Sequence, residues 1–231
     1  MTTHFLHIGK TGGTAIKHAL TPYRERFHLV LHEHITTLPH VPTGEGAFFF
    51  VRDPVGRFVS GFNSRRRCGR PRYDVPWTPG EQWAFARFDT PEALARALFS
   101  ADAKEAETAA RAMRSIGFVD GGSGQWLISP ACLLSRLRDI RFIGLTRALA
   151  TDFETLKRLL DLPSDCHLPD DAVDSHQAPA GSPVNLSAEA VSNLRRWYSV
   201  EFELYEFCMA LRSYMGWGQS AFPDYATRTG W

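Results

Sequence analysis

The sequence lacks the features that mark several large classes of protein. Its 231 residues include only four cysteines, which are scattered with no C-x-x-C spacing, so we expect neither a zinc site nor a disulfide framework. No stretch reaches the roughly 18 consecutive apolar residues that a membrane-spanning helix needs. The first six residues do not resemble a secretory signal. We therefore expect a cytoplasmic protein with reduced thiols and no integral membrane contact.

The sequence also lacks an excess of positive or negative charge. The formal net charge is +1, so no global field indicates a nucleic-acid partner. Any attraction for an anion must come from a local arrangement of Lys, Arg and backbone N–H groups. The apolar share of 44% is ordinary for a globular protein, and the length suits one domain with a sizeable core. We expect a single domain over residues 1–231.

Short apolar runs alternate with helical patterns along the chain. Such alternation predicts an α/β fold, a single P-loop-like domain whose central parallel sheet is flanked by helices. The third run is apolar on both faces, as in a covered parallel sheet. We expect strands at residues 5–8, 27–31, 47–51 and 140–144, and helices at 14–20, from Pro54 onward, at about 149–160, and as one long helix capped by Ser187.

Two segments are less regular. Residues 68–116 form a helical and loop insert, in which 68–80 is expected to be a loop and two or three helices follow between Pro91 and Ser115. Residues 163–186 are rich in Pro, Asp and Ser and predict a long loop, which we place near a nucleotide site.

The turn after the first strand has the composition of a phosphate-binding loop. Its residues are Lys10, Thr11, Gly12, Gly13 and Thr14. The N-terminus of the following helix offers unpaired N–H groups and a favourable dipole to an anion. The glycines permit a close approach of the backbone, and Lys10 adds a mobile cation.

The turn after the third strand predicts a second anion site. Arg52 sits at the carboxyl end of that strand, where ligands of open α/β sheets bind, and its guanidinium can fork two N–H donors onto phosphate. Ser60 follows two turns along the next helix and can offer its hydroxyl to the same group. Asp53 is expected to cap this helix, with Pro54 in its first turn.

Other nucleotide-binding classes share part of this pattern. Gly9-Lys10-Thr11 matches the end of the P-loop of kinases and NTPases, but the first glycine of that P-loop would fall at His4. Asp53 is the only candidate for a metal-binding aspartate. An ATP-dependent kinase and a non-catalytic nucleotide- or glycan-binding module remain alternatives.

The two loops together resemble a known family. Residues 6–14 resemble the 5′-phosphosulfate loop, and residues 50–62 the 3′-phosphate motif, of carbohydrate sulfotransferases, particularly the heparan sulfate 2-O-sulfotransferase group. Further similarity lies at residues 124–127, 142–146 and 176–205. The chain departs from the family pattern at three positions. Gly9 stands where the family usually has Pro, Ala15 where it often has Ser, and Arg147 where it usually has Glu.

The resemblance implies the co-substrate 3′-phosphoadenosine 5′-phosphosulfate (PAPS) and the product 3′-phosphoadenosine 5′-phosphate. Backbone N–H groups of residues 11–14 would hold the 5′-phosphate, and Arg52 and Ser60 the 3′-phosphate. Lys10 would stabilise the departing oxygen. No metal is required. The expected activity is transfer of the sulfuryl group to a hydroxyl of a carbohydrate or other alcohol.

Such a transfer needs a general base for the acceptor hydroxyl. Histidine suits the task because its pKa lies near operating pH. By resemblance to the His-x-His of the 2-O-sulfotransferase group, His34 is the first candidate, His32 the second and Glu33 a distant third. If the second strand extends this far, alternation points both histidines to one side. Surface histidines are the alternative interpretation.

Basic and aromatic residues follow the 3′-phosphate motif. An arginine cluster could bind an acidic glycan or form a solvated basic surface. Its members are Arg65, Arg66, Arg67, Arg70 and Arg72. Trp77, Trp83 and Phe85 could line a sugar site, although core packing is the commoner role of such residues. The acceptor and the oligomeric state are left open by the sequence.

Overall fold

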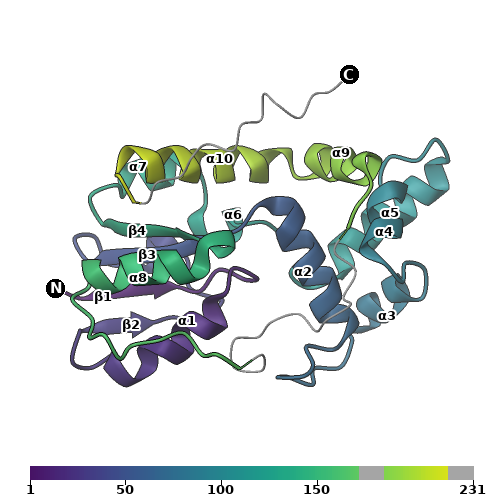
Figure 1. The fold of residues 1–231 in the computed structure, drawn as a ribbon. Helices are drawn as coiled ribbons and strands as arrows, with labels where there is room; N and C mark the ends of the chain where they lie inside the picture. Colours follow the sequence, from purple (N-terminus) through teal and green to yellow (C-terminus); the bar gives the residue numbers. More distant parts are fainter. Residues whose placement is uncertain (172–184, 218–231) are drawn as a thin grey trace.

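A four-stranded parallel sheet forms the centre of the molecule (Figure 1). The computed structural model describes residues 1–171 and 185–217. The strands are β1 (Thr3–Leu6), β2 (Leu29–Leu31), β3 (Gly46–Val51) and β4 (Ile140–Leu145), in the order β2-β1-β3-β4. All three pairings are parallel. The expected α/β architecture with a parallel sheet is confirmed.

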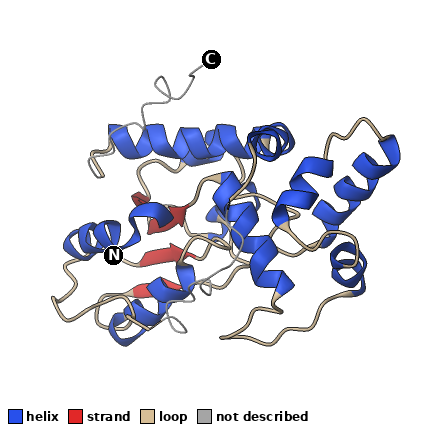
Figure 2. Cartoon of the chain, turned by 45° about the vertical axis from the view of Figure 1, so that its right-hand side comes forward, coloured by secondary structure: helices blue, strands red, loops and turns tan. Residues whose placement is uncertain are grey.

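Helices surround the sheet and extend beyond it (Figure 2). The α-helices are α1 (Gly13–Leu20), α2 (Pro54–Arg66), α3 (Pro79–Phe85), α4 (Pro91–Ala97), α5 (Ala103–Ser115), α6 (Gly124–Leu127), α7 (Pro130–Ser135), α8 (Leu149–Leu159), α9 (Ala188–Trp197) and α10 (Ser199–Tyr214). Short 3-10 helices lie at Thr21–Tyr23, Leu38–His40 and Thr146–Ala148. None of the helices in the described part of the chain is long and apolar enough to cross a membrane.

The buried apolar side chains of the described residues form two clusters. The first surrounds the sheet and includes side chains of α1, α8 and α10. The second joins α2, α3, α4, α5 and α9 and contains no strand residue. In Figure 1 the sheet and this helical cluster lie side by side, and α10 and α9 run above both. We call the two regions the sheet region and the helical region.

Several predicted boundaries were wrong. The first strand ends at Leu6, so His7 and Ile8 belong to the loop that follows it. The expected loop over residues 68–80 ends at Thr78, because Thr78 and Glu81 form a capping box that starts α3 at Pro79. Residues 172–184 of the predicted loop at 163–186 lie outside the described residues, so its placement near a nucleotide site stays a prediction.

The long helix expected from Ser187 is two helices, α9 and α10, which meet at Tyr198. The Tyr198 side chain is buried, and its hydroxyl donates to the carbonyl of Val119 at 2.6 Å. This contact draws the chain toward the segment before α6. The helix pair therefore bends at the boundary between the sheet and helical regions.

A buried arginine organises that boundary. Arg57 of α2 is fully buried and donates to the carbonyls of Phe118, at 3.0 Å, and Gly121. Glu201 of α10 lies 3.9 Å from its guanidinium and accepts from the N–H of Ser123 at 2.6 Å. Because burial of either charge alone would be costly, these contacts fix the segment that contains Phe118.

Candidate active site

A cavity of about 1000 Å³ lies where the carboxyl ends of all four strands face α2. Each strand contributes a lining residue just past its end: His7, His34, Arg52 and Thr146. Among the described residues, six Lys and Arg side chains line the cavity: Lys10, Lys17, Arg52, Arg65, Arg67 and Arg72. The one carboxylate among the described lining residues is that of Glu33. This concentration of positive charge, in a chain with a net charge of +1, favours an anionic ligand.

The loop before α1 presents backbone donors to this cavity. Gly12 adopts φ +85°, a left-handed conformation that a side chain would strain, and a Cβ on Gly13 would lie 2.0 Å from the His7 ring. Among the described residues, no acceptor is found for the backbone N–H groups of residues 12–14. Thr11 is buried, and its hydroxyl donates to the carbonyl of Ile8 at 2.9 Å. The first turn of α1 is thus shaped to bind an anion.

Lys10 belongs to the same loop, two residues before Gly12. Its backbone φ is 69°, and its Nζ lies 5.4 Å from the centre of the Phe118 ring. Burial, together with the nearby charges of Arg67 and Arg52, lowers the pKa of Lys10 to about 8. A bound anion would relieve this repulsion, so the ammonium group is placed to serve an anionic ligand.

Arg52 and Ser60 also line the cavity. Arg52 follows β3, and Asp53 caps α2 by accepting from the N–H of Gly56 at 2.7 Å, as expected from the sequence. Burial lowers the pKa of the Arg52 guanidinium. Within the described ranges the guanidinium forms no hydrogen bond, and both side chains line the cavity. They are free to bind a second anionic group.

His34 is held in one tautomer. Its Nδ1 lies 2.8 Å from the carbonyl oxygen of His7, which can only accept, so Nδ1 carries the proton and Nε2 presents a lone pair. Although the residue is exposed overall, desolvation of its ring lowers the pKa of His34 below the usual value, which favours the neutral ring near pH 7. The indole of Trp126 donates to the backbone carbonyl of His34 at 2.6 Å, and the Phe118 ring lies edge-on 5.6 Å away. These contacts suit a general base.

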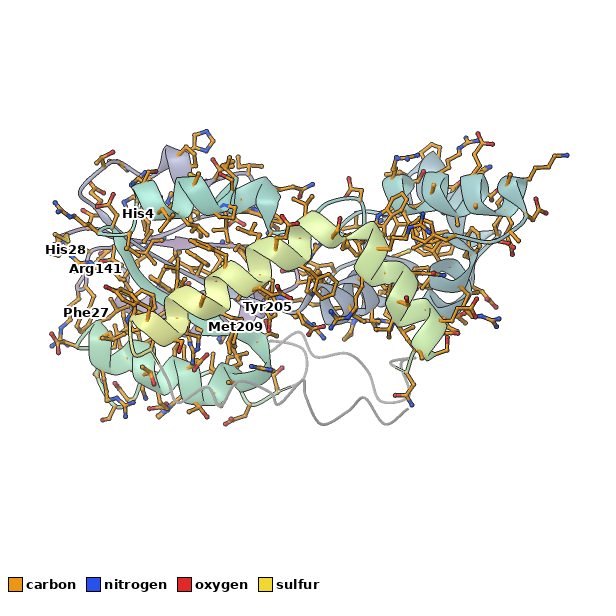
Figure 3. The ribbon with its side chains drawn as sticks, turned by 90° about the horizontal axis from the view of Figure 1, so that it is seen from above. His4, Phe27, His28, Arg141, Tyr205 and Met209 are labelled. Atoms are coloured by element: carbon orange, nitrogen blue, oxygen red, sulfur yellow. The ribbon has the colours of Figure 1, made fainter. Side chains whose placement is uncertain are left out.

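His32 lies apart from the cavity lining. The chain leaves β2 at Leu31, so the alternation that would put His32 beside His34 does not continue. Nε2 of His32 lies 2.8 Å from Nδ1 of His4, whose Nε2 is 2.5 Å from Glu45. Figure 3 shows His4 at the end of the sheet region farthest from the helical region. Glu33 does line the cavity, where Lys17 donates to its carboxylate.

The arginine cluster divides into different environments. Arg65 is buried and forms a two-point ion pair with Glu81, with N–O distances of 2.5 and 2.7 Å. Arg66 lies over the rings of Trp77 and Phe85. Arg70 pairs with Asp74 at the surface. Arg67 lines the cavity and bonds only to backbone carbonyls, at 3.0 and 3.1 Å, within the described structure.

Trp77, Trp83 and Phe85 pack within the helical region and are not among the residues that line the cavity. The Trp77 and Phe85 rings lie 5.0 Å apart, and the Trp77 indole donates to the carbonyl of Arg65 at 2.6 Å. Trp83 lies between the guanidinium groups of Arg87 and Arg111, at 4.3 and 4.0 Å. The sequence left open whether these residues line a sugar site or pack in the core, and the structure shows packing.

Sequence reasoning missed several residues of the cavity. Phe118 covers Lys10, Trp126 holds the backbone at His34, and the His7 ring lies tilted against the His34 ring with 3.9 Å between ring centres. His7 lies within residues 6–14, the predicted 5′-phosphosulfate loop, but only its long-range contact with His34 indicates that it belongs to the site. Residues 1–171 and 185–217 contain no group of three His, Cys, Asp or Glu side chains placed to hold a metal ion.

Comparison with known proteins adds one positive finding. No curated protein sequence matches the chain. A model of the sulfotransferase family matches residues 4–208, a span that contains the whole sheet except its first residue and every described residue of the cavity. The chain therefore belongs to the sulfotransferase family, whose members transfer sulfuryl groups.

Proposed function

We propose that this sulfotransferase moves the sulfuryl group of PAPS to a hydroxyl of a carbohydrate acceptor, as in the heparan sulfate 2-O-sulfotransferase group. The observation that supports this most strongly is one cavity in which the first turn of α1, Lys10 and Arg52 face the neutral His34. Two separate anion sites match a donor that carries phosphate at both its 5′ and 3′ positions.

The donor residues divide between the two sites. The N–H groups of residues 11–14 bind the 5′-phosphate, where the dipole of α1 adds to the attraction. Arg52 and Ser60 bind the 3′-phosphate through a guanidinium fork and a hydroxyl. Because the guanidinium forms no hydrogen bond to a described residue, a phosphate here would not compete with an internal partner.

The chemistry is an in-line displacement at sulfur. The acceptor oxygen forms the new S–O bond while the bond from sulfur to the bridging oxygen of the donor breaks. Nε2 of His34 takes the hydroxyl proton, because the His7 carbonyl keeps its Nδ1 protonated. Lys10 offsets the negative charge that develops on the bridging oxygen. Protein cations and dipoles offset the charge, so no metal is required.

The cavity leaves room for an acceptor beside the donor. Its volume of about 1000 Å³ lies at the upper end of the range for small-molecule pockets, about 300–1000 Å³. We propose that Arg67 contacts the acceptor, which favours a glycan that carries acidic groups. We further propose that residues 1–231 act as one sulfotransferase domain.

Transfer from radiolabelled PAPS to a panel of glycans and small alcohols tests this function. We expect label to reach a hydroxyl-bearing acceptor without added magnesium, and no transfer from ATP. The sole cavity carboxylate of the described residues, Glu33, is paired with Lys17, so the kinase alternative finds little support there. Magnesium-dependent phosphorylation of the same acceptors, with none sulfated, would overturn the proposal.

A further inference from the structure

His7 has a side chain whose burial the proposed chemistry does not explain. The residue is only 6% exposed, yet it lines the cavity. Its Nδ1 is fully buried and has no hydrogen-bond partner among the described residues. Burial of a polar atom without a partner is unfavourable, so an imidazole here needs a compensating role.

The position of the ring indicates where that role lies. The His7 ring lies against the His34 ring, with the two ring planes tilted by 39°. Its Cδ2–Nε2 edge abuts the first residue of α1, since a Cβ built on Gly13 would lie 2.4 Å from Nε2. Nε2 therefore lies beside the helix terminus whose backbone N–H groups have no partner within the described structure.

The other contacts of His7 do not require an imidazole. Nδ1–H of His34 donates to the backbone carbonyl of His7, and any residue at this position would have that carbonyl. A phenylalanine could place a ring against His34 without burying an unpaired nitrogen. What histidine alone adds at this place is a polar group on the edge next to Gly13.

We propose that Nε2–H of His7 is a neutral hydrogen-bond donor to the anionic group bound at the N-terminus of α1. This inference rests on the proposed function, in which that group is the 5′-phosphosulfate end of PAPS. In the neutral ring Nδ1 is then the unprotonated nitrogen, so the buried atom is an unfilled acceptor and not an orphaned donor. His7 would contact the donor directly, beside Lys10.

The surroundings of His7 keep it neutral. Burial, and after it the neighbouring charges of His34, Lys17 and Lys10, lower its pKa to about 3. These are the charged and titratable groups that face it from the β2 end, α1 and the loop. A neutral donor does not titrate between pH 5 and 8, so its contribution to binding is constant there.

Titration calorimetry of the full-length protein with 3′-phosphoadenosine 5′-phosphate tests the assignment. We compare the wild-type protein with His7→Phe, which keeps the ring and loses the donor, and with His7→Gln, whose amide nitrogen can reach the position of Nε2. We expect His7→Phe to weaken binding about tenfold, as for loss of a hydrogen bond to a charged group, and His7→Gln to remain within about threefold of wild type. If Phe is not accommodated beside Gly13, His7→Leu replaces it.

Three results would count against the assignment or its basis. Wild-type affinity in His7→Phe or His7→Leu overturns it, and so does equal weakening in His7→Gln and the apolar variant, which would assign the effect to packing. If wild type does not bind 3′-phosphoadenosine 5′-phosphate, the proposed function fails. The same variants titrated with inorganic sulfate then test the donor role of His7 separately.

Discussion

The sheet region and the helical region build their shares of the cavity by different means. The sheet region contributes backbone geometry: the left-handed Gly12, the first turn of α1, whose N–H groups have no acceptor among the described residues, and residues placed just past strand ends. The helical region contributes side chains held by other side chains, such as Arg65 on Glu81. The first kind of site depends on local sequence, and the second depends on contacts made through folding.

This difference affects what each region tolerates. On the sheet side, substitutions at Lys10 or His34 should affect the proposed chemistry, while the fold is carried by the buried, mostly apolar strands. On the helical side, a substitution in the Arg65–Glu81 pair changes the scaffold that presents Arg67. Variants on the two sides should therefore separate catalytic loss from loss of stability.

The largest expected effect is that of His34→Ala. Removal of the proposed base should lower kcat about 1000-fold, within the range for general-base catalysis, with little change in donor affinity. Turnover of radiolabelled PAPS with a good acceptor measures it. His40→Ala is the matched control, because His40 is exposed and hydrogen-bonds only to Thr37 among the described residues. Full turnover by His34→Ala would rule out the assignment.

On the helical side, Glu81→Gln should destabilise the protein by about 3 kcal/mol, because it leaves the buried Arg65 without its counter-charge. Urea unfolding measures the change. Asp74→Asn is the control, since its pair with Arg70 is exposed and should contribute little. Equal stability of Glu81→Gln and wild type would show that the helical region does not depend on this pair.

The pH dependence of donor binding should report on Lys10. With its pKa lowered to about 8, the ammonium is charged below that pH and loses its proton above it. The Kd for 3′-phosphoadenosine 5′-phosphate should therefore be constant below about pH 8 and rise at higher pH, up to about tenfold per unit. Lys10→Met should bind more weakly and lose this dependence. A wild-type Kd that is unchanged to pH 9.5 would contradict the lowered pKa.

The smallest expected effect concerns the acceptor. Arg67→Ala should raise the KM of an acidic acceptor about tenfold and leave kcat within about threefold, because a charge-assisted contact in binding is lost. Arg66→Ala is the neighbouring control, since that guanidinium lies over Trp77 and Phe85. A KM that rises equally for acidic and neutral acceptors would argue against a role in recognising charge.

The parts of the fold and the candidate site that sequence could predict are the local ones. The glycine-rich turn before α1, the Asp53 cap and the strand before Arg52 follow from short-range patterns of glycine, proline and apolar residues. The alternation of those elements was enough for a parallel α/β sheet. The end of β1 was misplaced by two residues because the apolar run continues through Ile8.

The remainder depends on contacts between distant residues. The tautomer of His34 is set by a carbonyl 27 positions earlier, and Phe118 reaches Lys10 only because Arg57 holds its backbone. The bend at Tyr198 results from one buried hydroxyl. Arg65, Arg66 and Arg67 are adjacent in sequence but have different partners, which no periodicity reveals.

The most direct test of PAPS as the donor is a paired titration of the wild-type protein with 3′-phosphoadenosine 5′-phosphate and with AMP, which lacks the 3′-phosphate. We expect the first to bind about 10- to 100-fold more tightly, through Arg52 and Ser60, and Arg52→Ala to remove most of that advantage. Equal affinity of the wild-type protein for the two nucleotides would contradict the donor site proposed here.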